Sequence, residues 1–508
     1  MNTMKKVLAI VVAAVMLLSM AVLAFADDSY SITITSDSTG HTFKAYQILK
    51  GTVTGTGSKS LGDPAYGKDV DGSGLAAALK IADAAALAAY IGNCDTAALI
   101  DFAATAAKFV SGGTALTESP NGTYKADLPA GYYLVVDETE LSGAHDANSR
   151  YILAVVTDVE VTAKIDYPDV EKDVLDYNDS VDSANGTWGK SADYDIGDDV
   201  EFRLTGTIPD TTGYKTYYYA FHDTMDDTFG TAKDFKVTVG GIEITTGYEI
   251  VTDTDDGCSF EVVIKDLISV INSVKDKAGY DATKGVVVTY TAELLDTAII
   301  YNPGQDNEVY LEFSNNPNYT SDGSGEPGDE PDEPPTGTTE KKKVVVFTYD
   351  VTVNKVDANS KAPITGAEFT LEKFVEGAGS EEYEGKTGAW VAVDQVEGTA
   401  GDKFQFTGLD DGYYRLTETK APEGYNKLAQ PIYFEVSAEH TADGTTLAET
   451  EDFKIVGKSL STDVENNTGA TLPETGGIGT TLFYIVGGLM VLVAGVLLIT
   501  KRRIKNVD

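Results

Sequence analysis

Cysteine, histidine and tryptophan are scarce in this 508-residue sequence, which has two, four and two of them. Because Cys94 and Cys258 are the only cysteines, a network of disulfides cannot hold the chain together. The histidines show no spacing typical of a metal site, and we expect neither a metal nor another cofactor. They are His41, His145, His222 and His440. If the domains are covalently reinforced, other side chains must form the bond.

Basic residues are also in deficit, with 38 Lys and Arg against 80 Asp and Glu, so the formal net charge is -42. Such a charge repels nucleic acid and anionic membrane surfaces, and we expect no nucleic-acid partner. Aromatic residues are not scarce, with 28 Tyr and 18 Phe. This supply of core-forming side chains argues against disorder as the reason for the acidity.

Two common hydrolase signatures are missing from the sequence. It contains no Gly-x-Ser-x-Gly nucleophile elbow and no His-Glu-x-x-His zinc helix. Carboxylate pairs carry no weight in so acidic a chain. A surface hydrolase is therefore disfavoured, and we expect a protein that is not an enzyme.

The N-terminal 26 residues have the pattern of a signal peptide. Lys5 and Lys6 precede an apolar core, and Ala24-Phe25-Ala26 forms an A-x-A cleavage site. We place the cut after Ala26 and expect everything downstream to be exported.

The C-terminal segment 471–508 combines a pentapeptide, an apolar run and a basic tail. The run from Ile478 to Thr500 has the roughly 20 apolar residues that a helix needs to cross a membrane. The basic cluster after it suits the cytoplasmic flank. The pentapeptide is Leu472, Pro473, Glu474, Thr475 and Gly476. Together these parts resemble the sorting signal of Gram-positive surface proteins, which sortase cleaves between Thr475 and Gly476.

The exported part is too long for one core and suits three mostly β domains. Alternating segments such as Ser29–Thr35 predict half-buried strands, and the Ala-rich stretch from Gly74 to Val110 predicts one or two helices inserted in the first domain. A stretch rich in Pro, Gly and acid predicts an extended linker. The predicted segments are 1–26 (signal peptide), 27–167 (N-terminal domain), 168–320 (middle domain), 321–343 (linker), 344–470 (third domain) and 471–508 (anchor).

Charged and amide residues fall in the apolar register of several predicted strands, since side chains two apart share a face. In the third domain these residues are Lys355, Glu418 and Asn466, and in the middle domain they are Lys172, Asp223 and Asn315. Each domain thus has a lysine near its start, an acid inside and an asparagine on its last strand. Residues that reach water at strand ends, or a buried ion pair, are the simpler explanation for any one of them.

The repeated order suggests a reaction. Burial lowers the pKa of a lysine and raises that of a carboxylic acid. A neutral amine can then attack the asparagine carbonyl while the protonated acid hydrogen-bonds its oxygen and transfers protons. Ammonia leaves, and an isopeptide bond joins the first strand to the last. Such a bond needs no cofactor.

The third domain resembles a CnaB-type domain of a SpaA-like fimbrial subunit. The resemblance rests on Pro363–Leu371 and on Gly412–Tyr425, which contains a stretch similar to the family's E-box. It implies tandem Ig-like, Cna-type β-sandwiches, with Lys355 bonded to Asn466 and Glu418 as the catalytic acid. Asn467 is the fallback partner.

The middle domain is similar to the isopeptide-forming domain of these pilins, through Val170–Val174 and Leu311–Pro317. The similarity implies a bond between Lys172 and Asn315 with Asp223 as the acid. Neighbouring residues leave that assignment open. They are Asp226, Asp227 and Asn316.

The N-terminal domain departs from the pilin pattern at one place. Polymerising pilins typically present a lysine in a Tyr-Pro-Lys motif, but Tyr167-Pro168 is followed here by Asp169. Lys164 is the nearest substitute and our candidate for the intersubunit lysine.

The full-length resemblance implies a major shaft pilin that a class C sortase polymerises and a housekeeping sortase attaches to peptidoglycan. Other copies of the chain and minor pilins would be its partners. The alternative is a monomeric, wall-anchored adhesin for a host surface ligand, which the missing Tyr-Pro-Lys lysine favours.

Overall fold

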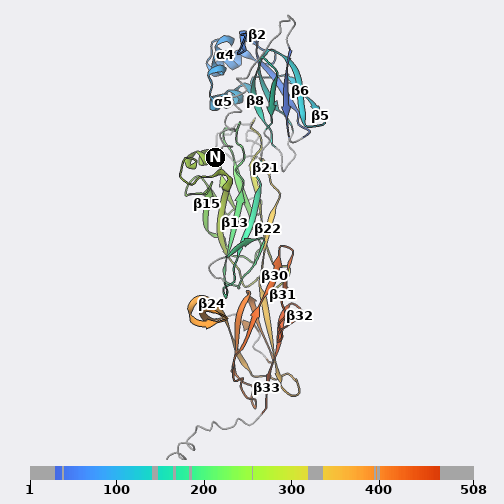
Figure 1. Cartoon of the computed structure of the whole chain (residues 1–508), viewed down its shortest axis with the longest axis vertical. Coiled ribbons are helices and arrows are strands. Elements are labelled where there is room, and N and C mark those ends of the chain that lie inside the picture. The colour runs from blue at the N-terminus through green and yellow to red at the C-terminus, as the bar shows by residue number, and fades with distance from the viewer. Residues whose placement is uncertain are drawn as a thin grey trace, which may run out of the picture.

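Three β domains stack end to end along the long axis of the molecule (Figure 1). The structure is a computed structural model. It describes residues 29–36, 39–139, 147–163, 167–181, 186–254, 256–317, 336–393, 396–397 and 401–468. Within these residues strands far outnumber helices, which confirms the predicted tandem, mostly β architecture. The predicted signal peptide (1–26) and the segment 471–508 lie outside the described residues.

The first domain is a sandwich of two sheets. Among its described residues the strand orders are β5-β6-β1-β9 and β3-β2-β7-β8, with β4 paired to β2. The strands are β1 (Ser29–Thr35), β2 (Phe43–Thr54), β3 (Ser60–Tyr66), β4 (Thr114–Ala115), β5 (Thr117–Ser119), β6 (Thr123–Pro129), β7 (Gly131–Asp137), β8 (Arg150–Val155) and β9 (Val159–Thr162). Ile32 and Ile34 of β1 are buried in the core between the sheets, which confirms the alternation read from the sequence.

Helices cover the outer face of the sheet that contains β2 and β7. The described part of the Ala-rich stretch forms three of them, where we predicted one or two: α3 (Gly72–Leu79), α4 (Ala84–Asn93) and α5 (Thr96–Ala107). Asp71, Asp83 and Asp95 cap their N-termini, each accepting a hydrogen bond from a backbone N–H three residues on. Aspartate is a favoured N-cap residue, so these regularly spaced caps divide one apolar stretch into three helices.

The middle domain is a sandwich of two larger sheets. As described, their orders are β11-β10-β13-β19-β15-β16 and β12-β22-β20-β14-β18-β17, with β21 paired to β20. The first sheet contains β10 (Val170–Asp176), β11 (Thr187–Gly189), β13 (Asp199–Gly206), β15 (Lys233–Val239), β16 (Ile242–Ile244) and β19 (Val286–Glu293). The second contains β12 (Ser191–Asp193), β14 (Tyr219–Met225), β17 (Glu249–Val251), β18 (Phe260–Ile264), β20 (Gln305–Ser314), β21 (Thr336–Thr338) and β22 (Lys342–Phe347). Helix α6 (Leu267–Val274) and the 3-10 turn η1 (Ala282–Lys284) complete the domain.

The boundary between the middle and third domains differs from our prediction. We expected the linker to reach Lys343, but β21 and β22 both pair with β20 and so belong to the middle domain. Val344 and Val346 lie in its core. The charge and proline content of 321–343 predicted a linker between two domains, but the described residues after 335 form β21 and β22 of the middle domain.

The third domain begins at β23 (Tyr349–Asp357), one residue after β22. In the part that the structure describes, its sheets have the orders β26-β27-β23-β33-β32 and β25-β24-β28-β29, with a separate hairpin β30-β31. The other strands are β24 (Glu368–Tyr383), β25 (Lys386–Ala392), β26 (Val396–Glu397), β27 (Lys403–Leu409), β28 (Gly412–Lys420), β29 (Ile432–Val436), β30 (Ala438–Thr441), β31 (Gly444–Leu447), β32 (Lys454–Val456) and β33 (Ser459–Asn466). The first strand β23 and the last strand β33 are parallel neighbours.

An ion cluster centred on the buried Lys373 joins the middle and third domains. Lys373 Nζ lies 2.8 Å from Asp195 Oδ2 and 3.0 Å from both Asp179 Oδ2 and Asp410 Oδ2. The lysine and Asp410 belong to the third domain, while the other two carboxylates come from the middle domain. Burial alone would lower the pKa of Lys373, but these carboxylates hold it well above its usual value. Ion pairs of Lys373 therefore connect the two domains at their junction.

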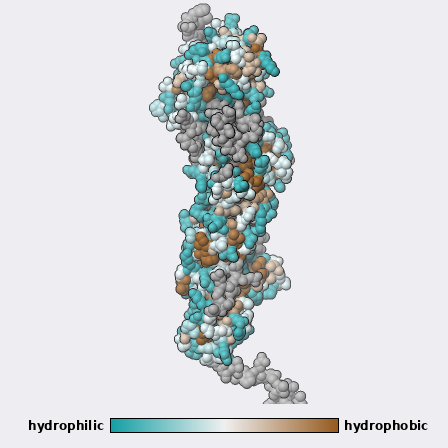
Figure 2. All heavy atoms as spheres, turned by 180° about the vertical axis from the view of Figure 1, so that it is seen from behind, coloured by the Kyte–Doolittle hydropathy of each residue, from teal (hydrophilic) through white to brown (hydrophobic). Residues whose placement is uncertain are grey.

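The surface is mixed, and hydrophobic residues on the face in Figure 2 form small, separate patches among hydrophilic ones. Within the described residues no single helix is long and apolar enough to span a membrane, and the bent pair α3 and α4 passes that test only by length and composition.

Candidate cross-linking sites

The middle domain buries Lys172 of β10 against Asp223 of β14, and neither side chain has exposed surface. The lysine Nζ donates a hydrogen bond to the Asp223 carboxylate and lies 3.1 Å from the Tyr290 hydroxyl oxygen. That hydroxyl is also 3.1 Å from both carboxylate oxygens of Asp223. Strand alternation points the three side chains into the core, because each lies on the inward face of its sheet.

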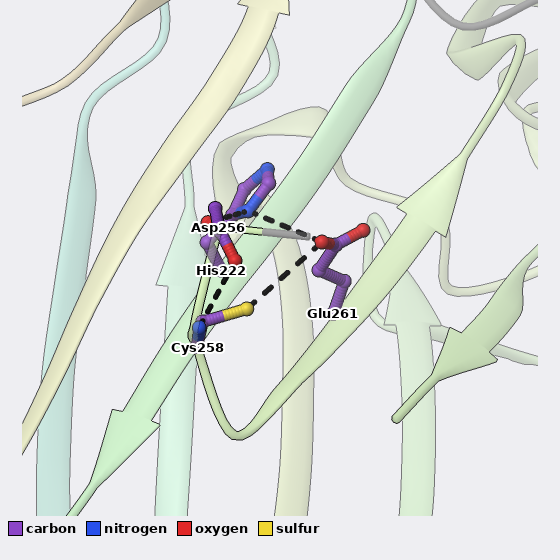
Figure 3. A group of neighbouring side chains, drawn as sticks. All are labelled: His222, Asp256, Cys258 and Glu261. Carbon is purple, nitrogen blue, oxygen red and sulfur yellow. Dashed lines mark hydrogen bonds and ion pairs between the residues drawn. The ribbon is translucent and has the colours of Figure 1, made fainter. Parts of the chain in front are cut away.

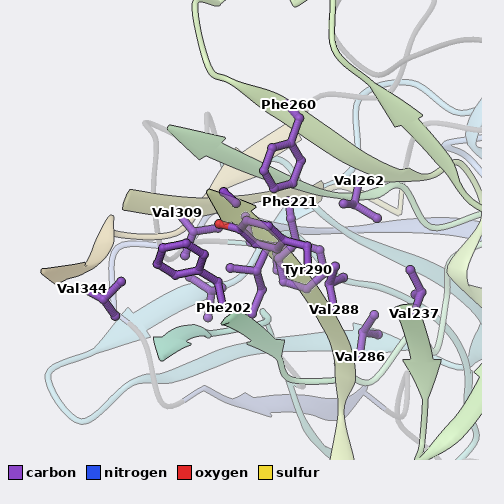
Figure 4. Close-up of a cluster of buried hydrophobic side chains, with 14 of the residues drawn as sticks. Phe202, Phe221, Val237, Phe260, Val262, Val286, Val288, Tyr290, Val309 and Val344 are labelled. Atoms are coloured by element: carbon purple, nitrogen blue, oxygen red, sulfur yellow. The ribbon is translucent and has the colours of Figure 1, made fainter. Parts of the chain in front are cut away.

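Aromatic rings enclose this cluster. Tyr290 stacks on Phe202, with ring centroids 5.3 Å apart, and Phe260 packs edge-on against it at 4.8 Å (Figure 4). Burial lowers the pKa of Lys172 to about 8 and raises that of Asp223, although the attraction between the two opposes both shifts. The apolar surroundings therefore shift both groups towards their neutral forms.

Asn307, at the start of β20, completes the cluster. Its side chain is fully buried, and its Nδ2 donates a hydrogen bond of 2.8 Å to the Tyr290 hydroxyl. The carbonyl oxygen Oδ1 has no hydrogen-bond partner among the described residues. A buried carbonyl oxygen without a partner is costly. This oxygen can accept a hydrogen bond from a proton donor while a nucleophile attacks the carbonyl carbon.

Asn315, which we predicted as the partner of Lys172, does not lie in this cluster. It follows Asn307 by eight residues along the same strand direction, which corresponds to roughly 25 Å. Its backbone carbonyl accepts a hydrogen bond of 2.8 Å from the amide of Asn148 in the first domain. The structure thus separates Lys172 from Asn315, so the pairing Lys172–Asn315 is wrong in this structure.

The physical reason is that Asn307, on the inward face of β20, and Asn315, just beyond its end, fall in the same period-two register. A period of two identifies the face but not the position along the strand. The register of β14 on β20 decides the position, because Asp223 is opposite Val309 and Met225 is opposite Asn307. Of the other candidates, Asp226 and Asp227 are exposed, which leaves Asp223 as the buried acid, and Asn316 follows Asn315 at the distant end.

The third domain brings together the three residues predicted for it. Lys355, Glu418 and Asn466 are all buried. Lys355 Nζ donates a hydrogen bond of 2.6 Å to the backbone carbonyl of Val464, two residues before Asn466 on the neighbouring strand β33. Asn466 Nδ2 donates a hydrogen bond of 2.8 Å to Glu418 Oε1. The alternative partner Asn467 is exposed.

The same chemical features recur in this second cluster. Burial lowers the pKa of Lys355, although Glu418 and Glu465 oppose the shift. Asn466 Oδ1 is buried and, within the described residues, has no hydrogen-bond partner. The other Glu418 oxygen, Oε2, accepts a hydrogen bond of 2.7 Å from the backbone amide of Leu428, which fixes the carboxyl group. Both clusters thus place an amine, an acid and an amide carbonyl in an apolar site.

Other predicted residues lie outside the described part of the chain. They are Lys164 and the pentapeptide 472–476. Both cysteines are free, which agrees with the absence of a disulfide network.

Comparison with known proteins identifies two segments. Residues 349–450 match the SpaA family, described as a prealbumin-like fold domain. Residues 464–506 match the LPXTG cell wall anchor motif. The chain therefore contains a SpaA-like domain followed by a cell wall anchor motif.

Two individual relatives share parts of the sequence. Over 112 residues, or 22% of this chain, it is 37% identical to a "Fimbrial subunit type 1" of Actinomyces viscosus, of which 18% is covered. Over 292 residues, or 44% of this chain, it is 25% identical to the "Trypsin-resistant surface T6 protein" of Streptococcus pyogenes, of which 50% is covered. The chain therefore aligns with half or less of the length of these relatives. Among solved structures, the T6 backbone pilin of S. pyogenes has a TM-score of 0.48 at 18% identity, covering 86% of this chain and 89% of that one.

Proposed function

We propose that this chain is the structural major subunit of a covalently polymerised surface pilus. Sortase cleaves it between Thr475 and Gly476 and joins the new carboxyl group to a lysine of the next subunit. The observation that best supports this proposal is the combination of a wall-anchor motif with two domains that each bury a lysine, an acid and an asparagine together. A class C pilin sortase, a housekeeping sortase, minor pilins and peptidoglycan are the partners.

Intramolecular isopeptide bonds stabilise two domains in this proposal. They join Lys355 to Asn466, with Glu418 as the acid, and Lys172 to Asn307, with Asp223 as the acid. The hydrogen bond from Asn466 to Glu418 and the shared Tyr290 hydroxyl support these assignments.

The reaction is the same in both domains. Once deprotonated, the lysine Nζ attacks the asparagine Cγ, and the acid, when it carries a proton, donates a hydrogen bond to the developing oxyanion. The acid then transfers a proton from the amine to the departing amide nitrogen. The Cγ–Nδ2 bond breaks, ammonia leaves and the Nζ–Cγ bond remains. Each domain reacts once, so the chain is a sortase substrate and not an enzyme.

Lys164 is the proposed acceptor for the neighbouring subunit, because Asp169 occupies the place of the usual lysine. Lys172 is a poor acceptor, since its side chain is buried in the middle domain. The test compares Lys164→Ala with Lys125→Ala, which removes an exposed lysine of the same domain.

The first experiment is an immunoblot of wall proteins released with muramidase and boiled in detergent. A ladder of heat-stable, high-mass bands is the expected result, and Lys164→Ala should reduce it to single subunits while Lys125→Ala leaves it intact. A single band near the subunit mass from the unmodified chain would overturn the pilus proposal. That result would favour the second candidate, a monomeric wall-anchored adhesin for a host surface ligand, which the missing Tyr-Pro-Lys lysine supports.

A further inference from the structure

The outer face of the middle domain carries a cluster of possible metal ligands that the cross-linking chemistry does not use. His222 lies on β14 beside Asp223 but points to the opposite face of the sheet. Glu261 of β18 is directly across from it, and Asp256 and Cys258 come from the loop that precedes β18 (Figure 3). The side chains therefore reach one point from three segments.

The spacing of the donor atoms suits a small cation. His222 Nδ1 lies 3.0 Å from Asp256 Oδ2 and 3.6 Å from Glu261 Oε1, and the Cys258 Sγ is 3.9 Å from that Glu261 oxygen. One donor from each of the four residues lies within 4.8 Å of the others. Four ligands bonded to zinc at about 2.0–2.3 Å in a tetrahedron are roughly 3.3–3.8 Å apart.

Neighbouring contacts hold the ligands in place. The other ring nitrogen of His222, Nε2, lies 3.2 Å from Glu312 Oε2. The Tyr310 ring stacks on the imidazole at 4.5 Å, and its hydroxyl donates a hydrogen bond of 2.7 Å to Asp256. A carboxylate on the second nitrogen is the arrangement that orients metal-bound histidines in proteins.

Asp256 and Cys258 are also held by hydrogen bonds before any ion binds. Asp256 Oδ1 accepts a hydrogen bond of 3.0 Å from the backbone amide of Cys258, and Thr254 Oγ1 donates one of 2.7 Å to the Cys258 carbonyl. His222 and Cys258 are buried, whereas Asp256 is exposed and leaves a side open to solvent. A preformed site with one open side allows an ion to enter.

We propose that His222, Asp256, Cys258 and Glu261 bind a divalent transition-metal ion, with zinc the best chemical match. Thiolate and imidazole donors suit zinc, whereas magnesium and calcium prefer oxygen ligands alone. Binding requires loss of the thiol proton, which is released to solvent. Glu312 acts as a positioning residue. The competing explanation is an imidazolium ion held between carboxylates, which gives the thiol no role.

Cobalt provides a direct test, because a thiolate–cobalt bond has its own near-ultraviolet charge-transfer band. The full chain, purified in detergent and stripped with a chelator, is titrated with Co²⁺ and then with Zn²⁺. We expect one equivalent of Co²⁺ to produce the band and Zn²⁺ to remove it. Cys258→Ser should abolish the band, whereas Cys94→Ser, which removes the first-domain cysteine, should leave it unchanged. Glu312→Gln should weaken Zn²⁺ binding by about 10–100-fold.

A second measurement needs no variant and so stays valid if Cys258→Ser does not fold. Zn²⁺ should protect Cys258 of the unmodified chain from a thiol reagent while the labelling of Cys94 stays the same, as mapped by peptide mass. Absence of the cobalt band, a band that persists in Cys258→Ser, or equal labelling of Cys258 with and without Zn²⁺ would each overturn the proposal.

Discussion

Lys172 and Asn307 hydrogen-bond the same hydroxyl group, that of Tyr290, at 3.1 and 2.8 Å. The two residues come from strands in different sheets, so a bond between them would join the two layers of the middle domain. Asn307 was not among the residues proposed from the sequence. The shared contact makes it the candidate partner of Lys172 and leads to the first prediction.

Replacing Asn307 with Ala should remove the isopeptide bond of the middle domain, because the electrophilic carbonyl is lost. The intact mass of the unmodified chain should be lower than its sequence mass by one ammonia per bond, and Asn307→Ala should show one ammonia loss fewer. Asn315→Ala is the matched control and should keep every loss. Retention of all losses in Asn307→Ala would refute the assignment.

Glu418→Ala should prevent the bond in the third domain, because neither Lys355 nor Asn466 would have a proton-transfer partner. The domain would lose a cross-link across more than 100 residues, whose loop-closure entropy is worth roughly 4–5 kcal/mol. Denaturant unfolding should therefore show a lower free energy of unfolding, alongside the missing ammonia loss. Glu423→Ala, which removes an exposed glutamate beyond the same strand, is the control. An unchanged mass for Glu418→Ala relative to the control would exclude the proposed role.

The Asn307→Ala chain should become more stable in alkaline solution. Without the bond, Lys172 keeps its amine, whose pKa in the fold is about 8 against 10.5 when unperturbed. Between these values the unfolded chain holds more protons than the folded one, so the free energy of unfolding rises with pH. The gain from this lysine is about 2–3 kcal/mol.

Urea unfolding of Asn307→Ala at pH 7.5 and at pH 10.5 measures this gain. The same chain with Lys172→Met added is the control, because it lacks the titrating amine. If both chains changed equally with pH, the buried lysine would not be the cause.

Lys373→Met should weaken the junction between the middle and third domains. It would leave Asp179, Asp195 and Asp410 close together without their cation. Removing one partner of a buried charge cluster costs about 3–5 kcal/mol, which denaturant unfolding can detect. Lys420→Met removes an exposed ion pair with Glu368 and should cost less than about 1 kcal/mol. If the two substitutions lowered the free energy of unfolding equally, the ion cluster around Lys373 would stabilise the protein no more than an exposed ion pair does.

The sequence predicted the fold class well because strand alternation is a local signal. Ile32 and Ile34 are buried as their spacing indicates, and the third-domain set of lysine, acid and asparagine meets because each residue lies on an inward face. Asn307 was missed in favour of Asn315, since register along a strand depends on its partner strands. The number of helices was also missed, although Asp83 and Asp95 were visible as cap signals.

The possible metal site could not be predicted from spacing at all. His222 and Glu261 meet through cross-strand register, and Asp256 and Cys258 join them through a loop. No short motif links residues brought together in this way. We therefore expected no metal from the four histidines, and only the arrangement of the strands suggests otherwise.

The parallel pairing of β23 with β33 determines how the molecule would respond to a pull along its long axis. A pulling force enters the third domain at the start of β23 and leaves at the end of β33. An amide between Lys355 and Asn466 would transmit this force directly from one strand to the other, without loading the rest of the domain. In the middle domain the proposed bond lies before β22, and residues 308–347 stay in the path of the load. Releasing both β21 and β22 from β20 would free residues 315–347, which extend to roughly 110 Å, before the junction parted. In each subunit of the shaft, the third domain would then not extend under load, and the middle domain would extend by partial unfolding.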